Sequence, residues 1–225
     1  VSGPDKARRW TVLPALCAVL LLGRQVFSWP GLEWLLLAAA LALPLSGVLT
    51  YGKPQALTFT DVCAMAAAGF AIPWAFSGLY GLRMLEGGYL LVLTPLVAAF
   101  CSDALALFTG MALGRHKLAP LVSPHKTVEG AAGGLVGGMA GMAIFCLVYR
   151  AITGVNLGLP LCVALGLLGA LLGELGDLSF SAVKRQYGIK DYGRLLPGHG
   201  GVLDRFDSVL FAAPVLCALL RALAA

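Results

Sequence analysis

Hydrophobic residues fill long runs along the whole chain, and only short stretches between these runs are polar. Most runs contain about 17 to 25 residues, which lets a helix cross a hydrocarbon core of about 30 Å. None alternates between polar and apolar positions as a barrel strand does. We therefore predict an all-α, polytopic integral membrane protein. Its seven predicted membrane segments are residues 11–27, 32–50, 58–80, 88–113, 130–152, 157–177 and 208–225.

The composition agrees with a bilayer environment. Hydrophobic residues make up 59% of the chain and charged residues only 12%, with a mean hydropathy of +0.87. A soluble domain carries about 25% charged residues, so this chain has too little polar side chain to cover a water-facing surface. The six cysteines all lie in apolar stretches and form no C-x-x-C pair, which argues against a zinc site or a disulfide framework.

The basic residues predict the orientation of the segments. Of the 16 Lys and Arg residues, only Arg24, Arg83, Arg150 and Arg221 fall on one side of the predicted membrane, and the other twelve fall on the opposite side. Cytoplasmic loops carry the excess of Lys and Arg. The loops around residues 114–129 and 178–206, which also hold all three histidines, are therefore predicted to be cytoplasmic.

Glycines recur at helical spacing in two neighbouring segments. Gly133, Gly137 and Gly141 repeat every four residues, and Gly169 and Gly173 continue the pattern in the next segment. Ridges of small residues let helices approach closely in lipid. We interpret them as packing surfaces, which would permit a homodimer without requiring one.

Two pairs of carboxylates have the same spacing at the inner ends of the last two segments. Glu174 and Asp177 are three residues apart, as are Asp204 and Asp207, so each pair shares a helical face. Hard oxygen ligands of this kind suit Mg²⁺ bound together with substrate phosphates. The alternative is that Asp204 and Asp207 only stabilise the beginning of a helix.

Asp103 lies about 15 Å inside its segment, at 1.5 Å per residue from the inner end. A carboxylate at that depth is costly and is usually functional. The alternative is a structural polar contact between helices.

The stretch from residue 181 to 207 combines basic residues with glycines. Lys184, Arg185 and Lys190 could neutralise a polyphosphate or a lipid phosphate. Glycines flank His199, and such a run lets backbone N–H groups approach a phosphate closely. Taken alone, the basic residues would equally suit a solvated loop on anionic lipid.

This stretch, S-A-V-K-R-Q-Y-G-I-K-D-Y-G-R-L-L-P-G-H-G-G-V-L-D-R-F-D, resembles the signature of phosphatidate cytidylyltransferases, also called CDP-diacylglycerol synthases. A second similar block contains G-R-H-K at 114–117 and S-P-H-K-T-V-E-G at 123–130, so the resemblance covers about residues 100 to 211. The chain departs from the family pattern at His125, where Lys or Asn is usual, and at Val128, where Trp is usual. Neither departure removes a carboxylate or a key cation.

The resemblance implies transfer of the cytidylyl group of CTP to phosphatidic acid, giving CDP-diacylglycerol and pyrophosphate at the cytoplasmic face of the inner membrane. It implies a Mg²⁺ held by Asp177, Asp204 and Asp207 and a second, monovalent cation such as K⁺. The spacing of the carboxylates adds Glu174 as a further metal ligand. The residues expected to act in catalysis are Asp177, Lys184, Arg185, His199, Asp204, Arg205 and Asp207. Those expected to bind substrate are Asp103, Ser123, Lys126, Thr127, Glu129, Ser181, Lys190, Asp191, Gly200 and Gly201.

The distribution of these residues suggests one membrane-embedded domain over residues 1–225. Residues 1–87 carry no motif and would supply scaffold helices, while 88–225 would form the catalytic helices and loops. No nucleic-acid partner is expected.

Two other kinds of function stay open at this point. One is a related CTP-dependent membrane lipid enzyme, such as a polyprenol or phytol kinase or an ether-lipid cytidylyltransferase. The other is a transporter that uses Asp103, Glu174 and Asp177 as an ion path, although no inverted repeat is evident.

The orientation can be tested by introducing a cysteine in the loop at 114–129. Ser123→Cys should react with a membrane-impermeant thiol reagent only after sealed cells are opened, because the positive-inside bias puts this loop in the cytoplasm. The native protein is the control for its own cysteines. Efficient labelling of intact cells would contradict the prediction.

Overall fold

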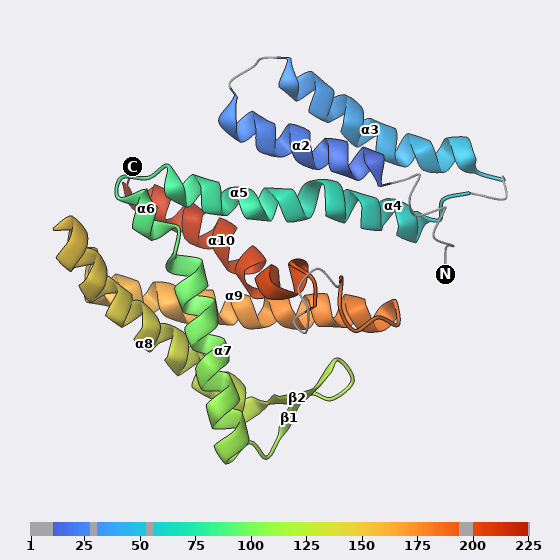
Figure 1. Ribbon diagram of the computed structural model, residues 1–225. Coiled ribbons are helices and arrows are strands. Elements are labelled where there is room, and N and C mark those ends of the chain that lie inside the picture. The colour runs from blue at the N-terminus through green and yellow to red at the C-terminus, as the bar shows by residue number, and fades with distance from the viewer. Residues whose placement is uncertain (1–10, 28–30, 53–55, 194–199, 225) are drawn as a thin grey trace. The chain divides into compact units, whose positions relative to one another are not determined.

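The computed structural model describes residues 11–27, 31–52, 56–193 and 200–224 (Figure 1). Contacts within the chain form two compact units, Val1–Ser77 and Gly78–Ala225, whose boundary lies inside helix α5 (Ile72–Arg83). The division between scaffold and catalytic helices at residues 87 and 88 stays a prediction.

The first unit consists of helices around a small apolar core. Its elements are α2 (Val12–Val26), α3 (Leu32–Thr50), α4 (Phe59–Ala66), a π-helical turn η1 (Ala67–Ala71) and the beginning of α5. Cys17, Leu43 and Met65 form the buried centre of this core. Helix α4 begins with a capping box, in which Thr58 and Asp61 each accept a hydrogen bond from the other's backbone N–H.

The second unit holds four long helices joined in sequence. After α6 (Gly88–Leu91) come α7 (Thr94–Leu113), α8 (Val128–Thr153), α9 (Leu159–Gln186) and α10 (Leu203–Ala224). Helix α7 packs along α8, α8 along α9, and α9 along α10 (Figure 1). A two-stranded antiparallel hairpin, β1 (Lys117–Ala119) and β2 (Ser123–Thr127), connects α7 to α8.

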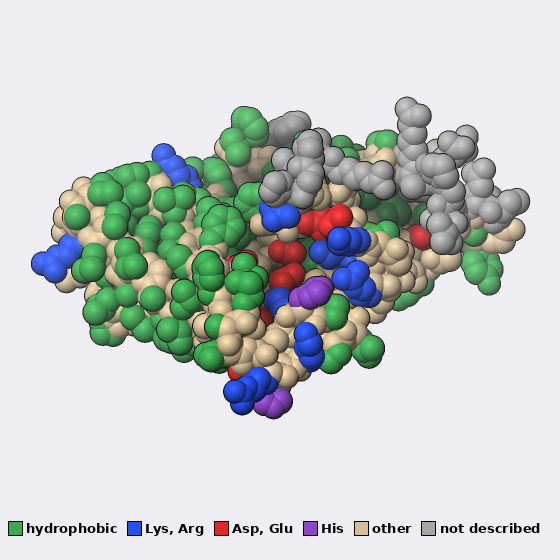
Figure 2. Space-filling view, turned by 60° about the horizontal axis from the view of Figure 1, so that its bottom comes forward, with side chains coloured by type: hydrophobic (Ala, Val, Ile, Leu, Met, Phe, Trp, Pro, Cys, Tyr) green, Lys and Arg blue, Asp and Glu red, His purple; other side chains and the backbone are tan. Residues whose placement is uncertain are grey.

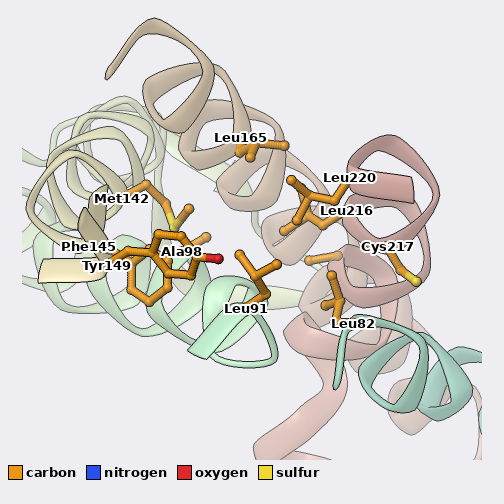
Figure 3. Packing of buried hydrophobic residues seen from close by; sticks show 11 residues of the cluster. Leu82, Leu91, Ala98, Met142, Phe145, Tyr149, Leu165, Leu216, Cys217 and Leu220 are labelled. Carbon is orange, nitrogen blue, oxygen red and sulfur yellow. The ribbon is translucent and has the colours of Figure 1, made fainter. Parts of the chain in front are cut away.

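Buried apolar side chains from the helices of this unit pack together in one core (Figure 3). Leu91 precedes α7, Tyr149 lies late in α8, Leu165 early in α9 and Leu216 late in α10. Leu216 and Met142 are fully buried. The other halves of α9 and α10 carry charged residues of the predicted site, namely Glu174, Asp177 and Lys184 on α9 and Asp204 and Asp207 on α10.

The glycine ridges form contacts between helices of the same chain. A Cβ on Gly133 or Gly137 would collide with Thr109 or Cys101 of α7. A Cβ on Gly138 would stand 2.7 Å from the carbonyl oxygen of Gly166, where α8 meets α9. Close packing therefore explains these glycines without a second copy of the chain.

All seven predicted segments are helical, and the fold class is confirmed. Six helices of the described chain are long and apolar enough to cross a membrane. The remaining apolar helix, α2, has 15 described residues and a length of about 22 Å, which falls short of the hydrocarbon core.

Two local features differ from the prediction. Helix α9 continues past the predicted end at Asp177 to Gln186, so Ser181, Lys184 and Arg185 lie on a helix rather than in a loop. The segment before α8 contains the hairpin instead of an irregular loop.

The helix contact at Gly166 can be tested with a matched pair of substitutions. Gly166→Ala should lower the free energy of unfolding by about 1–3 kcal/mol, because its methyl group would overlap the Gly138 carbonyl. Gly173→Ala in the same helix should be neutral or stabilise by up to about 1 kcal/mol, because its Cβ would meet Ser208 at an ordinary 3.5 Å. Thermal unfolding in detergent measures both, and equal effects would contradict the packing assignment.

Candidate functional site

A cavity of about 430 Å³ lies in the second unit between α7, β2, α8 and α9. Asp103, Lys126 and Glu174 supply its charged lining. Leu107 and Met111 form part of its apolar lining, and both are largely exposed on the outer face of α7. Figure 2 shows acidic side chains in a hollow of the surface, basic and histidine side chains around it, and hydrophobic side chains beside it.

Lys126 stands between two carboxylates of α9. Its Nζ lies 2.8 Å from Oδ2 of Asp177 and 3.5 Å from Oε1 of Glu174. The other oxygen of Asp177 accepts a hydrogen bond of 3.2 Å from Ser181. These contacts join the hairpin to α9, and they place one ammonium group where a metal cation would also be attracted.

The surroundings of Lys126 are strongly acidic. Burial alone would lower the pKa of Lys126, but Asp177, Glu174 and Asp103 raise it above the ordinary value, so the side chain is charged. The Asp103 carboxylate interacts electrostatically with Lys126, Asp177, Asp207 and Glu174, and it makes no hydrogen bond or ion pair with the described residues. Three carboxylates therefore face the ammonium group of Lys126, and its surroundings retain a negative charge.

Asp204 occupies a different environment. Its side chain is 5% exposed and is paired with Lys184 at 3.0 Å, while the backbone N–H groups of Tyr192 and Gly201 donate to Oδ2 at 2.8 and 2.9 Å. The carboxylate thus connects the end of α9, the segment after it and the beginning of α10. Breaking such a buried pair by removing one partner costs about 3–5 kcal/mol.

Tyr192 completes this arrangement. Its hydroxyl donates to the carbonyl of Phe180 at 3.0 Å, and its ring lies 5.5 Å from Nζ of Lys184. Burial, with Asp204 and Asp207 nearby, raises the pKa of Tyr192 to about 12, so the hydroxyl remains a donor at neutral pH.

Asp207 is buried in the first part of α10. Its Oδ1 accepts a hydrogen bond of 2.8 Å from the backbone N–H of Ser208, and its carboxylate interacts electrostatically with Asp177 and Asp204. The helices therefore bring Asp177 and Asp207 into the same electrostatic environment.

A ready-made three-ligand metal cluster is not formed by the described residues. Two of the predicted ligands instead have lysine partners: Asp177 has Lys126, and Asp204 has Lys184 and two backbone N–H groups. The paired oxygens of Asp177 and Glu174 nevertheless hold a cation between them, since the ammonium group of Lys126 lies there.

The hairpin that carries Lys126 is fixed at its base. Glu129, at the beginning of α8, accepts hydrogen bonds from the backbone N–H groups of Arg115 and His116 at 3.1 and 3.2 Å and pairs with His116 Nδ1 at 2.6 Å. Thr127 caps α8 by accepting from the N–H of Gly130 at 3.0 Å. Glu129 and Thr127, both expected to bind substrate, thus have structural partners.

The tip of the hairpin is held by α9. Arg185 donates from Nε to the carbonyl of Val122 at 3.1 Å. Arg185, predicted to bind phosphate, therefore positions the turn that precedes Ser123.

The other predicted residues lie around this centre. Ser123 begins β2 and is half-buried, while Lys190 and Asp191 are exposed after α9. Gly200 has a φ of +81°, a conformation that favours glycine, and Arg205 is exposed in the first turn of α10. His199 lies outside the described residues.

Sequence reasoning missed the roles of Tyr192 and of the hairpin. One signal was present: Glu174, Asp177, Ser181 and Lys184 follow one another at three- and four-residue steps, which continues a polar helical face beyond the predicted end of α9. Nothing comparable in the sequence distinguishes Tyr192.

Comparison with known proteins gives a consistent result. A family model described as the cytidylyltransferase family matches residues 2–223. The chain is 36% identical over 204 residues to a phosphatidate cytidylyltransferase of Staphylococcus saprophyticus, covering 90% of this chain and 75% of that protein. It is 42% identical over 166 residues to the Bacillus subtilis protein of the same name, covering 72% of this chain and 60% of the relative. A Staphylococcus aureus relative with that name is 39% identical over 158 residues, with 70% and 58% covered. The chain therefore spans less than two thirds of the length of the last two relatives.

The contacts of Glu129 at the base of the hairpin can be tested without substrate. Glu129→Ala should speed amide hydrogen exchange in residues 114–128, because the N–H groups of Arg115 and His116 lose their acceptor. The control is Glu33→Ala, which removes only a surface pair with Arg24. Unchanged exchange in the empty protein would show that Glu129 does not hold the hairpin.

Proposed function

This chain belongs to the cytidylyltransferase family, and on that basis we propose that it transfers the cytidylyl group of CTP to phosphatidic acid. A phosphate oxygen of phosphatidic acid attacks the α-phosphorus of CTP, and the bond from that phosphorus to the bridging oxygen of the β-phosphate breaks. The products are CDP-diacylglycerol and pyrophosphate.

The observation that carries this proposal is the cavity with two kinds of lining. Its charged part contains Lys126, Asp103 and Glu174, which suits phosphates and a cation. Its apolar part contains Leu107 and Met111, which also face outward. A lipid phosphate could enter past these side chains while its acyl chains remain in the bilayer, and CTP could arrive from water.

In this proposal the protein binds and aligns the two substrates, and little covalent chemistry is required of it. Lys126, partly exposed and adjacent to the cavity, would neutralise phosphate oxygens. Arg185 would act by holding the hairpin, and Lys184 by holding Asp204. Arg205, Lys190 and His199 would supply further contacts to the anionic substrates.

The residues also fit a divalent metal. Mg²⁺ is usually bound through one or two carboxylates together with substrate phosphates rather than by an all-protein cage. Asp177 and Glu174 already flank a cation, and Asp207 and Asp103 add negative charge nearby. We propose Asp177 as the principal ligand, with Glu174 and Asp207 beside it; Asp204 would join only by exchanging one of its present partners. A monovalent cation such as K⁺ would share these carboxylates. The metal would neutralise charge that develops on the phosphates.

The protein has the helices of a multi-pass membrane protein. We propose that the hairpin and the site face the cytoplasm, where CTP is available and where twelve of the 16 basic residues would then lie. Family membership favours this reaction over a CTP-dependent kinase or an ion-coupled transporter.

The assay for this proposal measures pyrophosphate release by the purified protein with CTP, Mg²⁺ and phosphatidic acid. Asp177→Asn should lower kcat by about 100-fold or more, because it weakens charge stabilisation at the reacting phosphates. It should also remove the gain in thermal stability that Mg²⁺ gives to the native chain. The control is Glu86→Gln, an exposed site outside the cavity lining. Release of pyrophosphate by Asp177→Asn at the native rate would refute the assignment of Asp177.

A further inference from the structure

Lys126 occupies the place between two carboxylates that a metal ion would need. The inference drawn from this rests on the proposed function. In the described chain, the ammonium group of Lys126 lies between Asp177 and Glu174, the two carboxylates proposed to approach the metal. A cation cannot enter between these oxygens while the ammonium group remains there, since both would occupy the same space. Metal and lysine must therefore compete.

Lys126 is suited to leave. Its side chain and that of Asp177 are 23% and 28% exposed, whereas the pair of Lys184 and Asp204 is 11% and 5% exposed. Lys126 lies on a strand that is fixed independently by Glu129 and by Arg185, so the hairpin retains its anchors when the ion pair breaks. Lys126 also lines the cavity, where a freed ammonium group would meet substrate phosphate.

The charge of the site explains why a lysine is needed there at all. Asp103, Glu174 and Asp177 surround Lys126, and Asp103 also interacts electrostatically with Glu174, Asp177 and Asp207. Without a cation, their mutual repulsion in a poorly hydrated site would favour protonation or distortion. A tethered ammonium group reduces this repulsion before any metal arrives.

We propose that Lys126 is an exchangeable internal counter-ion: it holds the cation position between Asp177 and Glu174 in the empty protein and moves to the substrate phosphates when a divalent metal takes that position. Metal binding without nucleotide is then weakened by competition. Nucleotide favours the exchange because its phosphates supply new partners for both cations.

The test measures binding of Mn²⁺ alone, by electron paramagnetic resonance, to the full chain in detergent without nucleotide. Lys126→Met should bind Mn²⁺ about ten-fold more tightly than the native chain, because a charged competitor has been removed. Lys126→Arg, which keeps the charge, should not bind it more tightly. Lys117→Met, an exposed site on the other strand of the hairpin, should bind it as the native chain does. Equal or weaker Mn²⁺ binding by Lys126→Met would overturn the proposal.

A second measurement uses the native chain and does not depend on the folding of a variant. Acylation of Lys126 by an amine-reactive reagent, followed by mass spectrometry, should become faster when Mn²⁺ is added, with Lys117 as the internal reference. Unchanged or slower acylation would overturn the exchange.

Pyrophosphate release from CTP and phosphatidic acid is measured on the same preparation. A normal rate without the Mn²⁺ effects would reject the counter-ion role and leave the proposed reaction intact. The Mn²⁺ effects without any pyrophosphate release would reject the reaction and support the counter-ion role.

Discussion

Ionised groups at the ends of apolar helices must be neutralised, and the arrangement of the second unit follows from this requirement. Removing a carboxylate from water is costly unless an opposite charge or hydrogen bonds compensate it. Lys126 compensates Asp177 and Glu174, and Lys184 compensates Asp204. Because the first lysine is on the hairpin and the second on α9, the two sets of ion pairs also join the hairpin to α9 and α9 to α10. Charge compensation and tertiary structure are thus provided by the same contacts.

Much of this fold could be predicted from the sequence, because the bilayer permits so few alternatives. An apolar run of sufficient length must be a helix, and all seven predicted segments are helical. The prediction was less accurate where the chain leaves the apolar environment. The charged residues after Asp177 suggested a loop. Instead, Ser181 and Lys184 continue the polar face of α9, where Ser181 binds Asp177 and Lys184 binds Asp204 of α10. The hairpin was missed because residues of other elements hold it: Glu129 of α8 accepts from the N–H of Arg115, and Arg185 of α9 donates to the carbonyl of Val122.

The candidate site could be predicted by residue type but not by partner. Helical spacing correctly indicated that Glu174 and Asp177 share a face. It could not distinguish Asp177 from Asp204, since both are aspartates near the polar ends of long helices. The distinction arises from the segment after α9, in which the N–H groups of Tyr192 and Gly201 turn toward Asp204. Such backbone donors depend on chain conformation and leave no pattern in the sequence.

The different exposure of the two lysines explains how one site can be both stable and reactive. A buried pair contributes order, because breaking it leaves an uncompensated charge. Lys184 and Asp204 are of this kind, and additional backbone donors hold the carboxylate in place. Glu174 lines the cavity and shares Lys126 with Asp177, and together with Asp103 these carboxylates outnumber the ammonium group that they face. This excess of negative charge destabilises the empty protein, and it gives an incoming cation a favourable place that a fully neutralised cluster would not offer. The rigid pair therefore maintains the geometry within which the incompletely neutralised pair can change partners.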